Sequence, residues 1–159
     1  MPIKIVFCAS ALVFSLALGA FAQTRASLTV GPLTVQPGAK ASGMIQVPAG
    51  KDEATTIPVS VIHGGRPGPT LALIAGNHGY DYRPALALQR LLPSLDPKQL
   101  SGALILVHVA NMPSFLKRTI YYSPVDGKNL NRVYPGKADG SVSERIPYQI
   151  TREVIERGE

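Results

Sequence analysis

The sequence predicts an α/β fold built on a largely parallel sheet. Two continuous apolar runs of strand length, TLALIAG (70–76) and ALILVHVAN (103–111), lie on either side of an amphipathic helical pattern at 83–95. A strand, a helix and a strand of these lengths form a βαβ unit, whose two strands are parallel. The composition, with 45% hydrophobic and 16% charged residues, is typical of a globular domain.

The start of the chain differs in composition from the rest. Lys4 precedes the apolar run IVFCASALVFSLALGAF (5–21), and the small residues of AFA end it. This pattern predicts a signal peptide over 1–22, and therefore a periplasmic or secreted protein. A retained membrane anchor is the alternative, but the run is shorter than the about 20 apolar residues of a typical span. The predicted mature chain has no cysteine, because Cys8 is the only one.

Short strands are expected in the first part of the mature chain. Stretches rich in β-forming residues occur at 26–30 and 43–47, and the alternating pattern TTIPVSVIH predicts a further strand at 55–63. GGRPGP (64–69) is a turn by composition. The run at 70–76 is apolar throughout, as expected of a central strand that is covered on both faces.

Two helices are predicted from periodicity. The first, at 83–95, has Pro84 in its first turn, and the second begins at Ser141, which can form a capping box with Glu144. The irregular segment 112–140 precedes the second helix, and its asparagines, tyrosines and glycines favour an ordered site loop. The apolar positions are Leu86, Leu88, Leu91, Leu92 and Leu95 in the first helix and Ile146, Ile150 and Val154 in the second.

The charged residues do not indicate a nucleic-acid partner. The net charge is +6, but the sixteen lysines and arginines are scattered along the chain. Their densest group, in LKRTIYY (116–122), is too short for a nucleic-acid-binding stripe. We therefore expect no nucleic acid among the partners.

A candidate metal site follows the first apolar run. His78 lies in AGNHGYD, and Asp81 follows it by three residues. Open α/β sheets bind ligands where their strands end. An imidazole and a carboxylate in this spacing can converge on one cation, and this donor set suits zinc. The alternative is a loop histidine beside an aspartate that caps the next helix, one position beyond the usual place.

A candidate carboxylate site lies in DGKNLNRVYPG (126–136). Arg132 offers a bidentate fork, and Asn131 adds an amide donor. Arg118, in the preceding segment, is a cation that could stabilise an oxyanion during acyl transfer. Taken singly, each of these residues is also typical of a turn-rich surface loop with a solvated arginine.

Taken together, the two motifs and the second buried run ending HVAN resemble the succinylglutamate desuccinylase/aspartoacylase family, among the zinc carboxypeptidase-like hydrolases. The resemblance extends from about Ile57 to the end of the chain. It implies an α/β/α sandwich around a mixed sheet. It also implies that His78 and Asp81 bind Zn²⁺, that the Asn-Arg pair holds a substrate carboxylate, and that the arginine upstream of DG assists at the carbonyl. These last residues match Asn131, Arg132 and Arg118.

The sequence departs from the family pattern in two ways. The acid ligand is normally Glu, and Asp81 is one methylene shorter, about 1.5 Å less reach, so that either the loop moves closer or the site is weakened. The family takes a further zinc-binding histidine and a glutamate base from segments beyond the position of residue 159. His108 lies in a buried run and is expected to be a core histidine. We therefore expect 23–159 to be a C-terminally truncated, partial zinc carboxypeptidase-like hydrolase domain.

The resemblance implies a zinc-dependent hydrolase of amide bonds in N-acyl amino acids or peptide-like carboxylates. The expected partner is a small-molecule carboxylate, with no stable membrane span after signal cleavage, and the oligomeric state is left open. Two alternatives stay open. One is a non-catalytic carboxylate-binding module or inactive fragment, and the other is a zinc carboxypeptidase acting on periplasmic peptides.

Overall fold

A computed structural model describes residues 25–158, so the predicted signal peptide (1–22) lies outside the described residues. The main sheet has four strands in the order β3-β4-β6-β5, beside a two-stranded ribbon, β1-β2. The strands are β1 (Leu28–Val30), β2 (Leu33–Val35), β3 (Ala39–Val47), β4 (Thr55–His63), β5 (Arg66–Ile74) and β6 (Ser101–Val107). The helices are α1 (Tyr82–Ser94), α2 (Met112–Lys117) and α3 (Val142–Glu153), with short 3₁₀ turns η1 (Leu130–Arg132) and η2 (Ile155–Arg157). Within 25–158, no helix is both long enough and apolar enough to cross a bilayer.

The predicted βαβ unit is confirmed, but the sheet as a whole is not largely parallel. β5 and β6 pair in parallel and are joined through α1, whereas β3 pairs with β4 and β4 pairs with β6 in antiparallel fashion. The physical reason is the short connection between β4 and β5, only residues 64–65, which is too short for a parallel crossover. The described sheet is therefore mixed and mostly antiparallel.

The apolar run at 70–76 does not form a central strand in the described part of the chain. β5 lies at the edge of the sheet with β6 as its neighbour, and Leu71 is 53% exposed. The prediction was wrong because a run of apolar residues does not report how many neighbours a strand has. β6, which lies between β4 and β5, is the covered strand of this unit.

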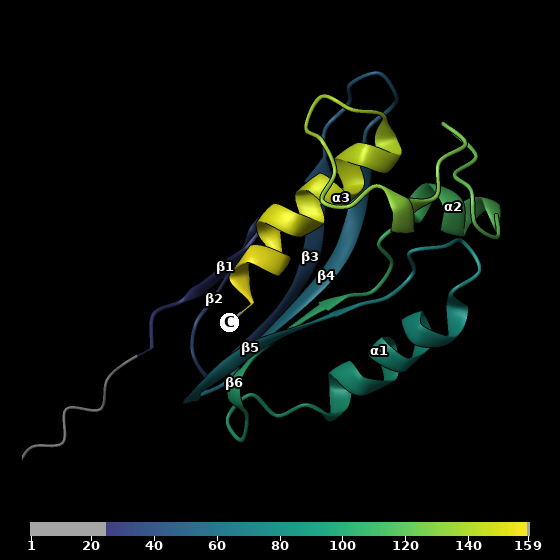
Figure 1. Cartoon of the computed structure of the whole chain (residues 1–159). Helices are drawn as coiled ribbons and strands as arrows, with labels where there is room; N and C mark the ends of the chain where they lie inside the picture. Colours follow the sequence, from purple (N-terminus) through teal and green to yellow (C-terminus); the bar gives the residue numbers. More distant parts are fainter. Residues whose placement is uncertain (1–24, 159) are drawn as a thin grey trace, which may run out of the picture.

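Helices pack on both faces of the sheet (Figure 1). On one face, α3 and the β1-β2 ribbon share a core with Val59, Val61 and Ile105. On the other face, α1 packs through Leu88 on Ile62 and Leu106. This is the three-layer α/β/α arrangement that the family resemblance implied.

The ends of α1 and α3 follow the predicted signals closely. Pro84 lies in the first turn of α1. At the start of α3, the Glu144 carboxylate accepts hydrogen bonds from the backbone N–H of Ser141 at 3.0 Å and from its hydroxyl at 3.1 Å. The apolar positions of α3, Ile146, Ile150 and Val154, are fully buried. The predicted capping pair and apolar stripe of α3 are confirmed.

Arg25, the first described residue, is hydrogen-bonded to the end of the sheet where β5 and β6 begin. The Arg25 guanidinium donates hydrogen bonds to four backbone carbonyls, with nitrogen–oxygen distances of 2.9 to 3.4 Å. These carbonyls belong to Gly64, Arg66, Gly68 and Gly102. One side chain thus joins the ends of three strands.

Candidate metal and carboxylate site

His78 lies just beyond the C-terminal end of β5, in a turn that depends on two glycines. Gly76 has a φ of +70°, a conformation that side chains rarely adopt. At Gly79, a Cβ atom would lie 2.0 Å from the backbone oxygen of Ser114 in α2. The turn can therefore pack against α2 only without a side chain at position 79, and the backbone at Gly76 sets the direction in which the turn leaves β5.

Asp81 occupies the N-cap position of α1, but its side chain makes no capping hydrogen bond. Instead, its Oδ2 atom accepts a hydrogen bond from the backbone N–H of His78 at 2.9 Å. The same oxygen lies 3.4 Å from the Nδ1 atom of the His78 ring. The carboxylate therefore turns back toward the histidine, unlike a helix-capping aspartate.

The spacing of these two atoms fits a zinc ion. Zinc binds nitrogen and carboxylate oxygen at about 2.0–2.2 Å with tetrahedral geometry, which separates two ligand atoms by about 3.4 Å. The Nδ1 to Oδ2 distance of 3.4 Å has this value. The turn brings the Asp81 carboxylate within reach of the His78 ring, and its role as a metal ligand stays a prediction. Within 25–158, no group of three His, Cys, Asp or Glu side chains could hold a metal together.

The other two histidines are engaged elsewhere. The buried His63 ring pairs through Nδ1 with the Val35 carbonyl at 3.0 Å. His108 pairs through Nε2 with the Ser60 hydroxyl at 2.7 Å, while its buried Nδ1 has no hydrogen-bond partner in the described part of the chain. His108 is half-buried and one of its ring nitrogens has no partner among the described residues, so the prediction of a satisfied core histidine at this position holds only in part.

The segment 126–136 brings Asn131 to His78. The Asn131 amide nitrogen lies 3.2 Å from His78 Nε2, across 53 residues of sequence. Arg132 follows it on η1, is exposed, and donates to the backbone oxygen of Asn131 at 3.4 Å. The structure thus gathers His78, Asp81 and Asn131 and places Arg132 beside them.

Arg118 lies at the C-terminal end of α2, and the structure shows no role for it. It is the C-cap residue of α2, with a φ of 55°, and it is exposed. The residue of this segment that contacts His78 is Tyr121, whose ring meets the imidazole edge-on with centroids 5.4 Å apart. An aromatic side chain therefore borders the candidate site where the sequence suggested an arginine.

Three residues that the motifs did not single out complete the cluster around His78. Asn129 places its amide oxygen 3.3 Å from His78 Nε2. Asn77 donates a short hydrogen bond to the Asn131 side chain, and it accepts one from the Tyr134 hydroxyl at 3.1 Å. Burial raises the pKa of Tyr134 to about 12, so this hydroxyl stays protonated near neutral pH. The sequence features that could have pointed to these residues are the two alternating asparagines of KNLNR (128–132) and the asparagine that precedes His78.

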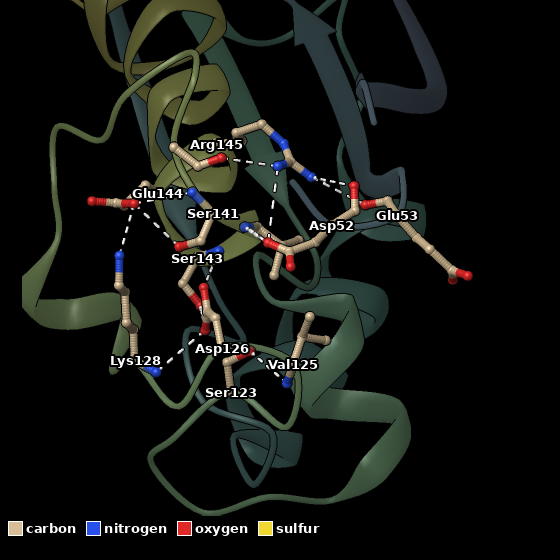
Figure 2. A network of polar contacts seen from close by, with 12 residues as sticks. Asp52, Glu53, Ser123, Val125, Asp126, Lys128, Ser141, Ser143, Glu144 and Arg145 are labelled. Atoms are coloured by element: carbon tan, nitrogen blue, oxygen red, sulfur yellow. Dashed lines mark hydrogen bonds and ion pairs between the residues drawn. The ribbon is translucent and has the colours of Figure 1, made fainter. Parts of the chain in front are cut away.

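A polar network holds segment 126–136 in place (Figure 2). The Asp126 carboxylate accepts from the backbone and hydroxyl of Ser143 at 3.0 and 2.7 Å. Arg145, which is buried, points from α3 to the backbone oxygens of Asp52 and Glu53 at 3.0 and 3.1 Å. The loop after β3 and the start of α3 are thus joined to the segment that carries Asn129 and Asn131.

Two carboxylates in this network are held in their charged form. Desolvation alone would raise the pKa of Asp126, but hydrogen bonds from Ser143 and from the backbone N–H of Lys128 outweigh it, and the pKa is lowered. For Glu144, the Lys128 ammonium, 2.8 Å away, is the main cause that lowers the pKa to about 2, and the Ser141 backbone adds to it. The network therefore stays ionised through the neutral pH range.

Of two cavities near the site, one lies away from the hydrogen-bonded cluster and the other touches it at Asp81. One of about 660 Å³, mostly apolar, lies between the loop 50–55 and α2, away from His78. Another of about 500 Å³ is lined by residues 80–84 and so includes Asp81 at its wall. The larger cavity therefore contains none of the residues that contact His78.

The described part of the chain has a mixed α/β core that is similar in fold to part of an aspartoacylase family protein. Residues 67–157 match the model of the succinylglutamate desuccinylase/aspartoacylase catalytic domain. The chain belongs to this family of hydrolases and deacylases.

Individual relatives agree with this assignment. N-alpha-acetyl-L-2,4-diaminobutyric acid deacetylase of Halomonas elongata is 41% identical over an alignment of 119 residues, and the match covers 71% of this chain and 34% of that protein. An aspartoacylase family protein of Mesorhizobium loti is similar in structure, with a TM-score of 0.70 and 39% identity over 77% of this chain and 38% of its own. The product-bound ectoine utilization protein EutE (DoeB) of Ruegeria pomeroyi is also similar in structure, with a TM-score of 0.67 and 32% sequence identity. This match covers 75% of this chain and 37% of that protein. The chain spans between a third and two fifths of the length of these relatives.

Proposed function

We propose that the chain is part of a zinc-dependent hydrolase that cleaves amide bonds in N-acyl amino acids or related small carboxylates. The observation that carries the proposal is the pair of His78 Nδ1 and Asp81 Oδ2, 3.4 Å apart beside the Asn131 amide. A metal-ligand spacing next to a carboxylate-binding amide is the arrangement that such chemistry needs. Membership of a family of hydrolases and deacylases supports the same reaction class.

Each residue of the cluster has a role in this proposal. His78 and Asp81 hold the metal, which when bound supplies Lewis-acid chemistry for the amide carbonyl. Asn131 and Arg132 orient the substrate through its carboxylate, by an amide donor and a guanidinium fork. Arg118, exposed at the end of α2, is our candidate for the cation that stabilises the developing oxyanion.

The similar proteins suggest the first compounds to test. The relative from Halomonas elongata is named for deacetylation of N-alpha-acetyl-L-2,4-diaminobutyric acid, which is an N-acyl amino acid. We propose that this protein acts on the same class of compound. The apolar pattern at 1–22 further leads us to propose that it does so in the periplasm or outside the cell.

Zinc binding tests the metal assignment directly. We expect equilibrium dialysis against a competing chelator to show one weakly bound zinc per chain, because two protein ligands leave the coordination open. His78→Ala and Asp81→Ala should each weaken binding by more than about tenfold, or about 1.4 kcal/mol. Asp139→Ala is a matched control, since this aspartate is exposed on another loop. Unchanged zinc affinity in Asp81→Ala would refute the assignment.

Acetate release from N-acetyl-L-2,4-diaminobutyrate separates a hydrolase from a binding module. A hydrolase releases acetate in proportion to bound zinc, whereas a carboxylate-binding module binds the compound and leaves it intact. Arg132→Ala should weaken binding of the compound and leave the zinc content unchanged, because the guanidinium contacts Asn131 and not the zinc ligands. Loss of zinc with retention of the carboxylate in this variant would reverse the roles assigned above.

A further inference from the structure

We propose a second reactive site on the face of the sheet that α1 covers, where the Ser42 hydroxyl accepts an acyl group from a small apolar ester. The Ser60 hydroxyl and the His108 ring carry the Ser42 proton away during this reaction. The site is separate from the cluster around His78 and needs no metal. It uses three side chains to which the proposed function gives no role.

The pairing of the strands brings the three side chains to one face of the sheet. Ser60 of β4 lies directly opposite Ser42 of β3 on one side and opposite Leu106 of β6 on the other. Side chains opposite each other in an antiparallel pair share a face. Leu106 belongs to the apolar cluster under α1, and His108 follows it by two residues. The two hydroxyls and the ring therefore lie on the side of the sheet that α1 covers.

A continuous chain of hydrogen bonds joins these side chains. The Oγ atom of Ser42 lies 2.7 Å from Ser60 Oγ, and Ser60 Oγ lies 2.7 Å from His108 Nε2. A serine hydroxyl can donate one hydrogen bond while it accepts another, so a proton can pass along this chain. Ser42 is exposed, whereas Ser60 is only 1% exposed. Ser42 is therefore the hydroxyl that meets a solute, and Ser60 links it to the ring.

A cavity of about 350 Å³ lies beside the chain of hydroxyls. This volume is at the lower end of the range of small-molecule pockets, about 300–1,000 Å³. Its wall contains Ser42, Ser60 and His108 together with Gly43 and the apolar residues Met44, Pro58, Val59 and Leu92. The apolar wall offers contacts to the part of an ester that does not react. β3, which carries Ser42, lies at the edge of the sheet opposite to β5, the strand that leads to His78.

The ring at the inner end of the chain is neutral near pH 7 and can act as a base. Burial lowers the pKa of His108, so the uncharged form predominates. Its Nδ1 atom is buried without a partner among residues 25–158. A buried N–H without an acceptor is costly, so the proton rests mainly on Nε2. The less populated tautomer, with the proton on Nδ1, accepts from Ser60, and we therefore expect acylation to be slow but measurable.

The acyl transfer balances in bonds and protons. Ser42 Oγ forms a bond to the carbonyl carbon of the ester, and the bond from that carbon to the leaving oxygen breaks. The Ser42 proton passes to Ser60 as the Ser60 proton passes to His108 Nε2, and the imidazolium then gives a proton to the leaving oxygen. The products are an O-acyl serine and an alcohol. Water can release the acid from the serine by the same route.

The experiment uses p-nitrophenyl acetate and the whole chain, with a chelator in the buffer so that no metal takes part. We expect a burst of p-nitrophenolate stoichiometric with the protein, and mass spectrometry should locate the acetyl group on Ser42. Ser42→Ala should abolish both. Ser94→Ala is the matched control, because Ser94 is an exposed serine whose hydroxyl donates to the Leu91 backbone oxygen. It should react as the unchanged protein does.

Variants of the two inner residues test the relay. Ser60→Ala and His108→Ala should each slow acetylation of Ser42 by at least about tenfold, because general-base assistance is typically worth about 10²–10⁴ in rate. Added imidazole should restore part of the rate in His108→Ala and none in Ser42→Ala. A merely structural role of His108 would not produce this rescue.

Two results would overturn the proposal. One is acetylation that is unchanged in Ser42→Ala or spread equally over exposed lysines and hydroxyls. The other is a rate at Ser42 that is unchanged in both Ser60→Ala and His108→Ala. Circular dichroism checks the fold of each variant, and His108→Gln, which lacks a base, replaces His108→Ala if the latter does not fold. Because zinc is absent throughout, these results leave the proposed function to its own tests.

Discussion

At the residue scale, His108 shows how incomplete pairing makes a half-buried ring sensitive to pH. Its Nε2 pairs with the Ser60 hydroxyl, which in turn pairs with the Ser42 hydroxyl at 2.7 Å. Its Nδ1 is buried with no partner in the described part of the chain. Protonation would place a second N–H where nothing accepts it, and desolvation accordingly lowers the pKa of His108 below 6.5.

We therefore expect acid to destabilise the fold through His108. Because the folded-state pKa is below the unfolded value of 6.5, the unfolded chain binds the proton more readily. This contribution to stability is complete above pH 6.5 and decreases as the pH falls below it. Urea denaturation between pH 5 and pH 8 measures the effect, and His108→Gln, which keeps a polar group near Ser60, should remove that part of the pH dependence. If His108→Gln shows the same dependence of stability on pH as the unchanged protein, His108 is not the cause of the acid destabilisation.

The sequence could predict part of the cluster and not the rest. His78 and Asp81 are three residues apart, so one local turn decides their geometry. Asn129 was not predicted to contact His78, because the fold alone brings it across 51 residues. The motif DGKNLNRVYPG singled out Asn131, which lies beside the His78 ring, but its role in binding a carboxylate stays a prediction. The motif contains several polar residues and does not show which of them reach the ring.

At the element scale, α3 owes its position to one apolar stripe. Ile146, Ile150 and Val154 are fully buried against the sheet. We expect Ile150→Ala to lower the free energy of unfolding by about 2–5 kcal/mol, because the truncation leaves a cavity in a close-packed core. Leu86→Ala in α1 is the control, since Leu86 is 50% exposed and its loss should cost less than about 0.5 kcal/mol. Urea denaturation measures both, and equal losses would show that α3 is not packed as described.

Helices were easier to predict than the irregular segment and the sheet. The period of α3 and its capping pair are local signals, and both were confirmed. Within 112–140, α2 and η1 went unpredicted, because each is too short for a period to show. The position of α2 depends instead on the contact of Gly79 with Ser114, which no local pattern reports.

At the scale of the whole molecule, β5 is an edge strand of the described sheet that exposes apolar side chains. It is uncharged over 67–74, and Leu71 and Ile74 are 53% and 38% exposed. An uncovered apolar edge strand promotes pairing with other chains. The prediction of a mostly parallel sheet was wrong for a related reason, since strand pairing is decided between distant segments and not within a strand.

We expect this chain to self-associate through β5. Light scattering or sedimentation at increasing protein concentration should show association, and Leu71→Lys should reduce it, because a charge at the edge opposes pairing. Leu86→Lys adds the same charge on the exposed side of α1 and should change association much less. Equal behaviour of the two variants would mean that β5 is not the contact.

The hydrogen bonds of Arg25 also determine on which side of the protein a tag joined ahead of this residue would lie. Its guanidinium is bound where β5 and β6 begin, whereas His78 lies beyond the opposite end of β5. A tag or a surface linkage joined ahead of Arg25 would therefore leave from the side turned away from the imidazole. Attachment at that point would leave the residues around His78 exposed to solvent. Zinc and small acids should therefore still reach His78 in the immobilised protein.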